Sequence, residues 1–128
     1  MKPERVIVWG GRDFDDEPLV RAVLTHLIEQ CGDGWPVIVH GDSRGADRLA
    51  ARVARELGCD TEAHPADWGR HGRSAGWVRN SRMAQAGAVL CVAFPGGRGT
   101  ASMVEIAREA GIRVLEVAPG ALQAMEAA

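Results

Sequence analysis

The chain has 128 residues with a formal net charge of −2, and 46% of its residues are hydrophobic, which suggests one domain spanning 1–128 and argues against intrinsic disorder. The three cysteines are widely spaced and form no CxxC pair, so the sequence indicates neither a disulfide framework nor a thiolate metal site. Without a leader-like segment or an apolar run of membrane-spanning length, we expect a soluble cytoplasmic protein with no resident metal or cofactor.

The first half of the chain predicts two strands that alternate with two helices. The β-branched run at 5–9 predicts a strand, and Asp16 is placed to cap the helix that follows, with Pro18 in its first turn. Residues 37–40 predict a second strand, and apolar residues then recur at helical spacing until Gly58 ends the second helix.

The second half predicts three more strands and two more helices. In chain order these are a weak strand at 59–64, a loop at 65–73, a helix from Ser74 to about Gln85, the most apolar strand at 88–94, a helix from near Thr100 to Gly111, a strand at 112–117 and a tail at 118–128. The core of the domain is therefore expected at about 5–117.

Alternating strands and helices predict an α/β fold with a five-stranded parallel sheet covered on both faces. The most apolar strands belong at the centre of the sheet and the two more polar ones at its edges, which gives the order 3-2-1-4-5. Ligands of such sheets bind beyond the carboxyl ends of the strands at the topological switch point, which here lies between the first and fourth strands. The glycine-rich segments 10–14 and 95–100 follow these two strands, so we expect them to be neighbours.

The segment PGGRGT at 95–100 carries the clearest chemical signal. Its glycines allow a ligand to approach the backbone closely, and the helix that follows directs unpaired N–H groups and its positive dipole end into the same space. Arg98 and the Thr100 hydroxyl can add contacts to an anion, although Thr100 can instead cap the helix. A tight turn that needs glycine for geometry alone is the other explanation. The segment is neither a Walker A nor a GxGxxG sequence.

The distribution of charge also favours an anion site, since no acidic residue lies between Asp67 and Glu105. This interval holds five arginines: Arg70, Arg73, Arg79, Arg82 and Arg98. An anionic partner for the interval is one explanation, and a solvated run of charge is the other. Trp68 lies beside these arginines, where it could stack on a base or pack in an interface.

Two further loops and the third predicted helix supply candidate residues. Asp13 could accept a hydrogen bond from a ribose hydroxyl or pair with a nearby positive group, and Asp47 could act in the site or simply complement a helix dipole. The four histidines show no metal-ligand spacing. The candidates that would flank a ligand or phosphate are Gly10, Gly11, Arg12, Gly41, Gly45, Arg79 and Asn80.

Five motifs, taken together, resemble the YspA-like branch of the SLOG superfamily. They are GGRDF, HGDSRGAD, PADW, GRSAGWVRNSRM and FPGGRGT, and the resemblance covers roughly 5–117. The superfamily is Rossmann-like and includes cytokinin-activating phosphoribohydrolases, the DNA-processing protein A family and sensor domains for nucleotide-derived signals. The resemblance implies a nucleotide-like ligand over the glycine loop that follows the fourth strand, and a homodimer with its cleft near the interface.

The phosphoribohydrolases carry two motifs that this sequence matches only in part. Arg79 and Met83 match the motif on the third helix, where Asn80 replaces a lysine. Gly96, Gly97, Gly99 and Thr100 match the motif after the fourth strand. Ser102 stands where those enzymes have their catalytic glutamate, and Glu105 lies nearly a full turn further along the helix. The resemblance thus retains the residues that hold the ligand and lacks the hydrolytic carboxylate.

Three functions follow from these observations. The first is binding of a nucleotide or nucleotide derivative, for sensing, transport or sequestration, with the phosphate on Gly96, Gly97, Arg98, Gly99 and Thr100. The second is hydrolysis of the N-glycosidic bond of a nucleoside monophosphate, with Arg79 as a catalytic residue and Asp13 or Asp47 supplying the missing carboxylate. The third is binding of single-stranded nucleic acid through the arginine-rich interval, which the overall acidity disfavours.

Overall fold

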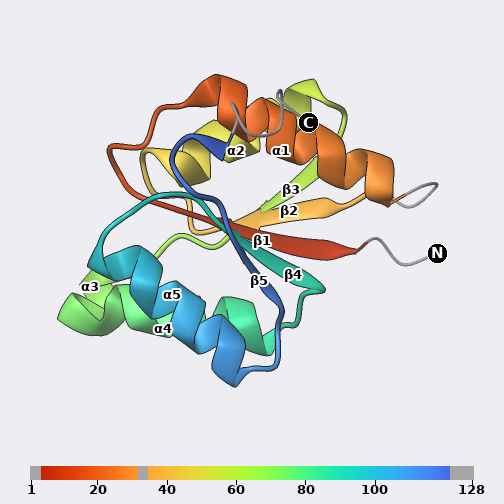
Figure 1. Ribbon diagram of the computed structural model, residues 1–128. Helices are drawn as coiled ribbons and strands as arrows, with labels where there is room; N and C mark the ends of the chain where they lie inside the picture. The colour runs from red at the N-terminus through yellow and green to blue at the C-terminus, as the bar shows by residue number, and fades with distance from the viewer. Residues whose placement is uncertain (1–3, 32–34, 122–128) are drawn as a thin grey trace.

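The computed structural model of the chain describes residues 4–31 and 35–121, with the side chain of Arg98 excepted. Five parallel strands form one sheet in the order β3-β2-β1-β4-β5, which confirms the predicted topology (Figure 1). Residues 122–128 of the predicted tail lie outside the described residues. In the described part of the chain, the helices are all too short or too polar to cross a membrane.

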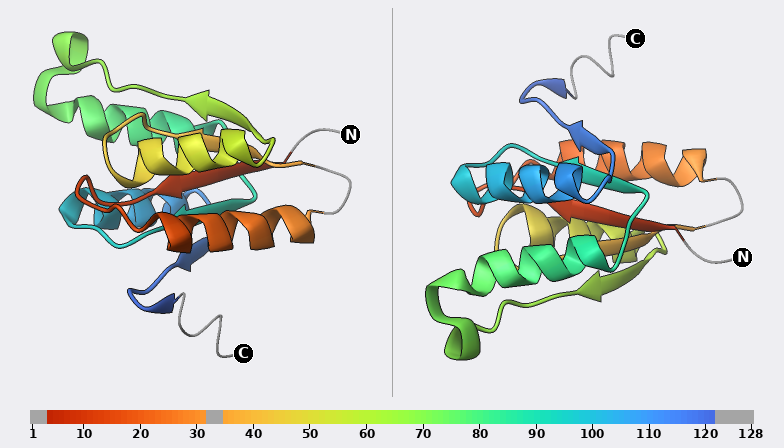
Figure 2. Two further views of the ribbon diagram at one scale, coloured as in Figure 1. Left: turned by 90° about the horizontal axis from the view of Figure 1, so that it is seen from above. Right: turned by 90° about the horizontal axis from the view of Figure 1, so that it is seen from below.

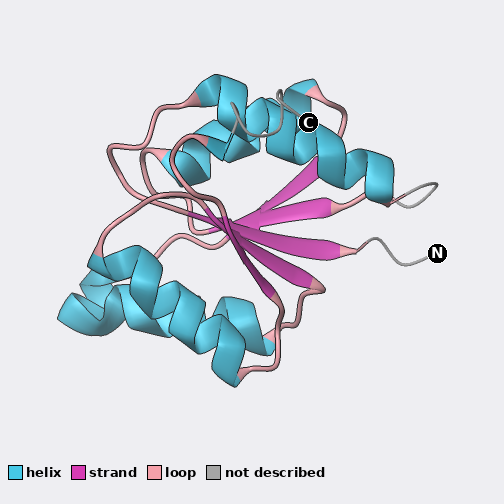
Figure 3. Cartoon of the chain, in the orientation of Figure 1, coloured by secondary structure: helices cyan, strands magenta, loops and turns pink. Residues whose placement is uncertain are grey.

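Helices and strands alternate along the chain, as Figure 3 shows. The elements are β1 Arg5–Trp9, α1 Glu17–Gln30, β2 Val37–His40, α2 Ala46–Glu56, β3 Asp60–Ala63, α3 Trp68–His71, the 3₁₀ turn η1 Gly72–Ser74, α4 Ala75–Gln85, β4 Leu90–Ala93, α5 Arg98–Glu109 and β5 Val114–Glu116.

The sheet lies between two helical layers. Helices α1 and α2 cover one face, and α4 and α5 cover the other, with α3 beyond the carboxyl edge of the sheet (Figures 1 and 2). Strand β1 shows why both faces are buried: Val6 and Val8 belong to the core beneath α1 and α2, whereas Ile7 and Trp9 belong to the core beneath α4 and α5. The central strands are thus continuous apolar runs, as parallel strands covered on both faces require.

The segment predicted as a loop at 65–73 contains structure of its own. Helix α3 forms because the Asp67 side chain accepts a hydrogen bond from the backbone N–H of Arg70 at 3.1 Å, and η1 follows it directly. Ser74, where we expected this helix to begin, is the N-cap residue of α4, but its side chain makes no cap hydrogen bond, because its hydroxyl donates to the carbonyl of His71 at 2.9 Å.

The helix after β4 begins two residues earlier than predicted. Its N-cap is Gly97, so Thr100 lies in the first turn and does not cap the helix. By contrast, the start of α1 is as predicted: Asp16 is the N-cap and its carboxylate accepts from the backbone N–H of Leu19 at 3.2 Å. With this earlier start, Gly97 is the N-cap of α5 and Gly99 lies in its first turn, next to the candidate site.

Candidate functional site

The loops that follow β1, β2 and β4 are joined by backbone hydrogen bonds at the carboxyl edge of the sheet. The N–H of Gly11 donates to the carbonyl of Pro95 at 2.9 Å, and the carbonyl of Gly11 accepts from the N–H of Ala46 at 3.1 Å. The two glycine-rich segments that we expected to be neighbours are therefore in direct contact. Gly11 forms the joint, because its N–H binds one of the other loops and its carbonyl binds the other.

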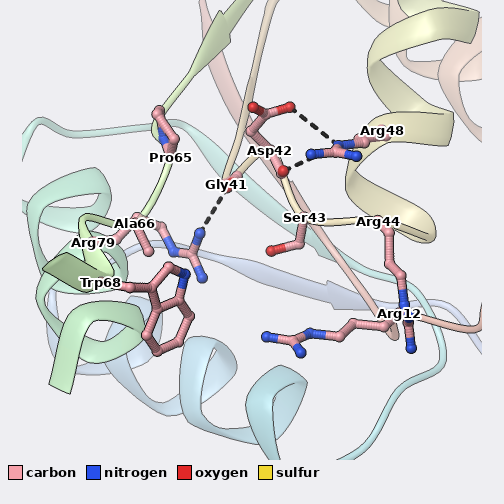
Figure 4. A pocket seen from close by; sticks show the side chains of 10 residues that line it. All are labelled: Arg12, Gly41, Asp42, Ser43, Arg44, Arg48, Pro65, Ala66, Trp68 and Arg79. Atoms are coloured by element: carbon pink, nitrogen blue, oxygen red, sulfur yellow. Dashed lines mark hydrogen bonds and ion pairs between the residues drawn. The ribbon is translucent and has the colours of Figure 1, made fainter. Parts of the chain in front are cut away.

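Beside this joint lies a cleft with two adjoining lobes, which we name the α5 lobe and the β2 lobe. The α5 lobe has a volume of about 380 Å³ and is lined by Trp9, Gly10, Gly11, Arg12, Ser43, Trp68, Gly76, Trp77, Arg79, Asn80, Gly97, Gly99, Thr100 and Ser102. The β2 lobe has a volume of about 410 Å³ and is lined by Arg12, Gly41, Asp42, Ser43, Arg44, Arg48, Pro65, Ala66, Trp68 and Arg79 (Figure 4). Four residues line both lobes: Arg12, Ser43, Trp68 and Arg79.

The N-terminus of α5 opens on the α5 lobe. No side chain caps this helix, and its first turn contains no acidic residue. Within the described part of the chain, the backbone N–H groups of Gly99 and Thr100 have no hydrogen-bond partner; the first N–H in this turn with one belongs to Ala101, which donates to Gly97 at 3.1 Å. Unpaired N–H groups at the positive end of a helix dipole form a site for an anion.

The glycines of the 95–100 segment fall into two kinds. A Cβ on Gly96 would collide with Oγ1 of Thr100 and lie 2.6 Å from the backbone N of Gly11, so the packing of the loops requires glycine there. A Cβ on Gly97 or Gly99 would meet no protein atom within 4 Å. Because the fold does not need glycine at these last two positions, they are the ones that a bound ligand could explain.

Arg79 is held in place from several sides at the junction of the lobes. Only 8% of it is exposed, its Nε donates to Oδ1 of Asn80 at 2.7 Å, and its Nη1 donates to the carbonyl of Gly41 at 2.7 Å. Its Cζ lies 4.5 Å from the centroid of the Trp9 ring, a cation–π contact. Burial lowers the pKa of this guanidinium, which still stays charged at neutral pH. Among the described residues Nη2 has no partner, which leaves the two N–H groups of this nitrogen for a ligand.

Asp47 lies beneath the site and is fully buried. Its Oδ2 accepts from the backbone N–H of Gly41 at 3.0 Å, while Oδ1 has no hydrogen-bond partner within the described residues. Burial raises the pKa of this carboxyl to about 7, against the opposing influence of the Gly41 N–H and of Arg79. The peptide groups flanking Gly41 are thus held by Asp47 on one side and Arg79 on the other, so Asp47 positions the loop without lining either lobe.

The other candidate carboxylate, Asp13, is at the surface. Its side chain is 97% exposed, lies 3.6 Å from Arg44 and lines neither lobe. Among the residues that line the cleft, Asp42 carries the one carboxylate, and its Oδ1 lies 3.4 Å from Nε of Arg48. Ser102 does line the α5 lobe, at the position where the phosphoribohydrolases have a glutamate. The cleft consequently offers a ligand cationic groups and no unpaired carboxylate.

The structure brings together most of the residues predicted for the site. In the cleft are Gly10, Gly11, Arg12, Gly41, Arg79, Asn80, Gly97, Gly99 and Thr100. Gly45 and Gly96 lie in the packing between the loops, and Gly45 adopts a φ of +81° at a position where a Cβ would collide with the carbonyl oxygen of Gly11. The side chain of Arg98 lies outside the part of the chain that the structure describes, so its role stays a prediction.

Several lining residues were missed or only partly anticipated. Ser43 lies inside the HGDSRGAD motif, and Pro65 and Ala66 follow β3 at the same sheet edge, so strand order alone could have placed them. Trp77 and Arg48 could be assigned only once the helix orientations were known. No group of three His, Cys, Asp or Glu residues in the described chain is arranged to hold a metal ion.

The doubly wound parallel sheet, with its glycine loops meeting at the switch point, defines a Rossmann-like α/β protein. Residues 4–71 match the family described as YspA, cpYpsA-related SLOG family, and the chain belongs to this family. It is also similar to the Gene 61 protein of Mycobacterium phage D29, with 42% identity over 87% of this chain and 94% of that protein. The family match ends before α4 and α5, so the residues that these two helices contribute to the α5 lobe lie outside the matched segment.

Proposed function

We propose that this protein binds a nucleotide or nucleotide derivative, with a phosphate of the ligand at the N-terminus of α5. The observation that carries the proposal is the pair of unpartnered N–H groups, on Gly99 and Thr100, that open on a cleft also lined by Arg12 and Arg79. Helix amides and guanidinium groups are the donors that proteins use for phosphate. Membership of the SLOG family supports a nucleotide-related ligand.

Two exposed tryptophans provide a surface for the base of such a ligand. Trp68 is 53% exposed and Trp77 is 61% exposed, and both line the α5 lobe. Large aromatic rings at the rim of a cleft can stack on a nucleobase, a contact worth about 1–3 kcal/mol per base. A nucleotide would then place its phosphate on α5 and its base toward these rings.

Binding without hydrolysis is the function that the cleft supports better. Ser102 cannot act as a general acid or base at neutral pH, and neither Asp13 nor Asp47 lines the cleft to replace the missing glutamate. Sensing, transport or sequestration of the ligand needs no such carboxylate.

The test is calorimetric titration with the 5′-monophosphates of adenosine, guanosine, cytidine and uridine, together with chromatography for released base. We expect at least one to bind without release of its base, and to stabilise the protein by about 2.7 kcal/mol at a hundred times its Kd. Arg12→Ala should weaken binding about tenfold, because Arg12 is exposed and lines both lobes.

The matched control is Arg113→Ala, which removes the same charge just before β5, at the opposite edge of the sheet. Binding that Arg12→Ala leaves unaffected would mean that the ligand lies elsewhere. Binding that both variants weaken equally would mean that the effect comes from net charge alone. Base release that Arg79→Ala abolishes would favour the hydrolase. A homodimer is a further prediction, which light scattering in solution tests.

A further inference from the structure

We infer that the β2 lobe binds a second phosphate of the same ligand, so that the preferred ligand is a nucleoside with phosphates at two separate positions. This inference rests on the proposed function, because it assumes that the first phosphate lies on α5. It adds a second subsite and narrows the ligand to a nucleoside bisphosphate.

The charge of the β2 lobe favours an anionic group. Four arginines line it, Arg12, Arg44, Arg48 and Arg79, whereas Asp42 is the carboxylate in its wall. Arg48 is engaged by Asp42, both through the carboxylate and through the backbone carbonyl, which its Nε reaches at 3.2 Å. Arg44 lies 3.6 Å from the almost fully exposed Asp13, a contact that water screens and that contributes little energy. Arg12, which has no ion pair within the described chain, and Arg44 are therefore available to a ligand.

The form of the lobe shows that side chains would bind this second group. Helix α2 begins beside the lobe, but two of the three N–H groups of its first turn are already used: Ala46 donates to Gly11 at 3.1 Å and Arg48 donates to Ser43 at 3.2 Å. A second anion would therefore be held mainly by guanidinium groups, whose planar donors match a phosphate in two-point contacts. Figure 4 shows Arg12 and Arg44 on the same side of the lobe, with Ser43 between Asp42 and Arg12.

The two lobes are continuous enough for one molecule to occupy both. Arg12, Ser43, Trp68 and Arg79 line each of them, so the lobes adjoin along these side chains. Either lobe alone has a volume within the range of about 300–1,000 Å³ typical of small-molecule sites. A nucleoside held against Trp68 at the junction would direct one phosphate to α5 and leave the β2 lobe for the other.

Three ligands with one base test the inference: the 5′-monophosphate, the 5′-diphosphate and the 3′,5′-bisphosphate, titrated calorimetrically at constant ionic strength. The base is the one that binds best among the monophosphates. We expect the bisphosphate to bind at least tenfold more tightly than the monophosphate and more tightly than the diphosphate, which has two phosphates at one position. Arg44→Ala should remove most of the bisphosphate's advantage, whereas Arg113→Ala should retain it.

The outcomes separate the two proposals. A bisphosphate that binds no more tightly than the monophosphate or the diphosphate overturns the second subsite and leaves the proposed function intact. An advantage that survives Arg44→Ala also overturns it, because the second phosphate would then lie elsewhere. If none of the monophosphates or bisphosphates of the four bases binds, the proposed function fails and the second subsite fails with it.

Discussion

Helices α2 and α5 begin in similar sequence and different surroundings. Each follows a central strand at the carboxyl edge of the sheet, and each has a glycine N-cap, Gly45 or Gly97, without a side-chain cap hydrogen bond. At α2 the chain itself occupies the helix start, because Gly11 and Ser43 accept hydrogen bonds from Ala46 and Arg48. At α5, in the described residues, Gly99 and Thr100 keep unpaired N–H groups beside a cavity.

The charge in the first turn differs in the same way. Helix α2 carries Asp47 in its first turn, a carboxylate that interacts with the dipole of its own helix, whereas the first turn of α5 has no acidic residue. A glycine-rich helix start is therefore not by itself a binding site. What makes α5 a candidate is that the protein leaves both the N–H groups and the positive dipole end uncompensated.

The largest expected effect is a pH dependence of folding stability caused by Asp47, the carboxylate in the first turn of α2. Asp47 has a pKa of about 7 in the folded protein against an ordinary value of 3.8, so the folded state binds the proton more tightly than the unfolded state. Stability should therefore fall as the pH rises from about 4 to about 7, by roughly 4 kcal/mol in total. Asp47→Asn cannot ionise and keeps an oxygen for the N–H of Gly41.

Urea unfolding of the wild type and of Asp47→Asn across this pH range measures the effect. The two should have similar free energies of unfolding near pH 4, and the variant should become progressively more stable than the wild type toward pH 8. Asp60→Asn, at an exposed site, serves as the control and should show no such divergence. A difference that stays constant with pH would mean that Asp47 ionises normally in the fold.

A second prediction contrasts one glycine from each helix start. Gly45→Ala should lower the free energy of unfolding by about 2 kcal/mol or more, because the residue has a φ of +81° and a Cβ would collide with the carbonyl oxygens of Gly11 and Arg12. Gly99→Ala should leave stability unchanged or raise it by up to about 1 kcal/mol, since its Cβ meets no protein atom and alanine favours the helix.

The same Gly99→Ala variant should bind nucleoside monophosphates less tightly, because the added methyl group occupies the space proposed for the phosphate. Gly69→Ala in α3 is the matched control, with its Cβ in ordinary contact distance of Asp67 and its position outside both lobes. Thermal unfolding with and without the nucleotide measures both properties. Full affinity in Gly99→Ala would argue against a phosphate at this turn.

An effect of about tenfold on affinity is expected from a carboxylate added to the open helix start. Ser102→Glu adds a carboxylate near the start of α5, just as α2 has Asp47 in its first turn. It should weaken binding of a nucleoside monophosphate about tenfold, or about 1.4 kcal/mol. Ser102→Gln has nearly the same size without the charge and should weaken it less. Equal losses in the two titrations would attribute the effect to size and not to charge.

Much of the fold could be predicted from residue patterns alone. Apolar strands in the centre, polar strands at the edges and the handedness of βαβ units are enough to give the order 3-2-1-4-5. The cap by Asp16 was equally local, because it depends on a carboxylate three residues before the N–H that it accepts from. The helix at 68–71 was missed because only four residues form it, too few to show a hydrophobic period.

The site could be predicted only in part, because its residues come from helix α4 and from the segments that follow four separate strands. The glycine segments indicated which loops meet, yet the sequence did not show which glycines serve packing and which remain open. Gly96 and Gly97 are neighbours with opposite surroundings, a difference that arises from where Thr100 and Gly11 lie in space. For the same reason the sequence did not show that Asp47 is buried and Asp13 is exposed.

The position of Trp68 has a practical consequence. Its half-exposed indole borders both lobes, so a ligand that enters either lobe changes the polarity around a natural fluorophore. The intrinsic fluorescence of the protein can therefore report ligand binding. A change of tryptophan emission in two stages during a titration would indicate that the two lobes are occupied one after the other, and a change in one stage would indicate that they are occupied together. The measurement needs no attached dye.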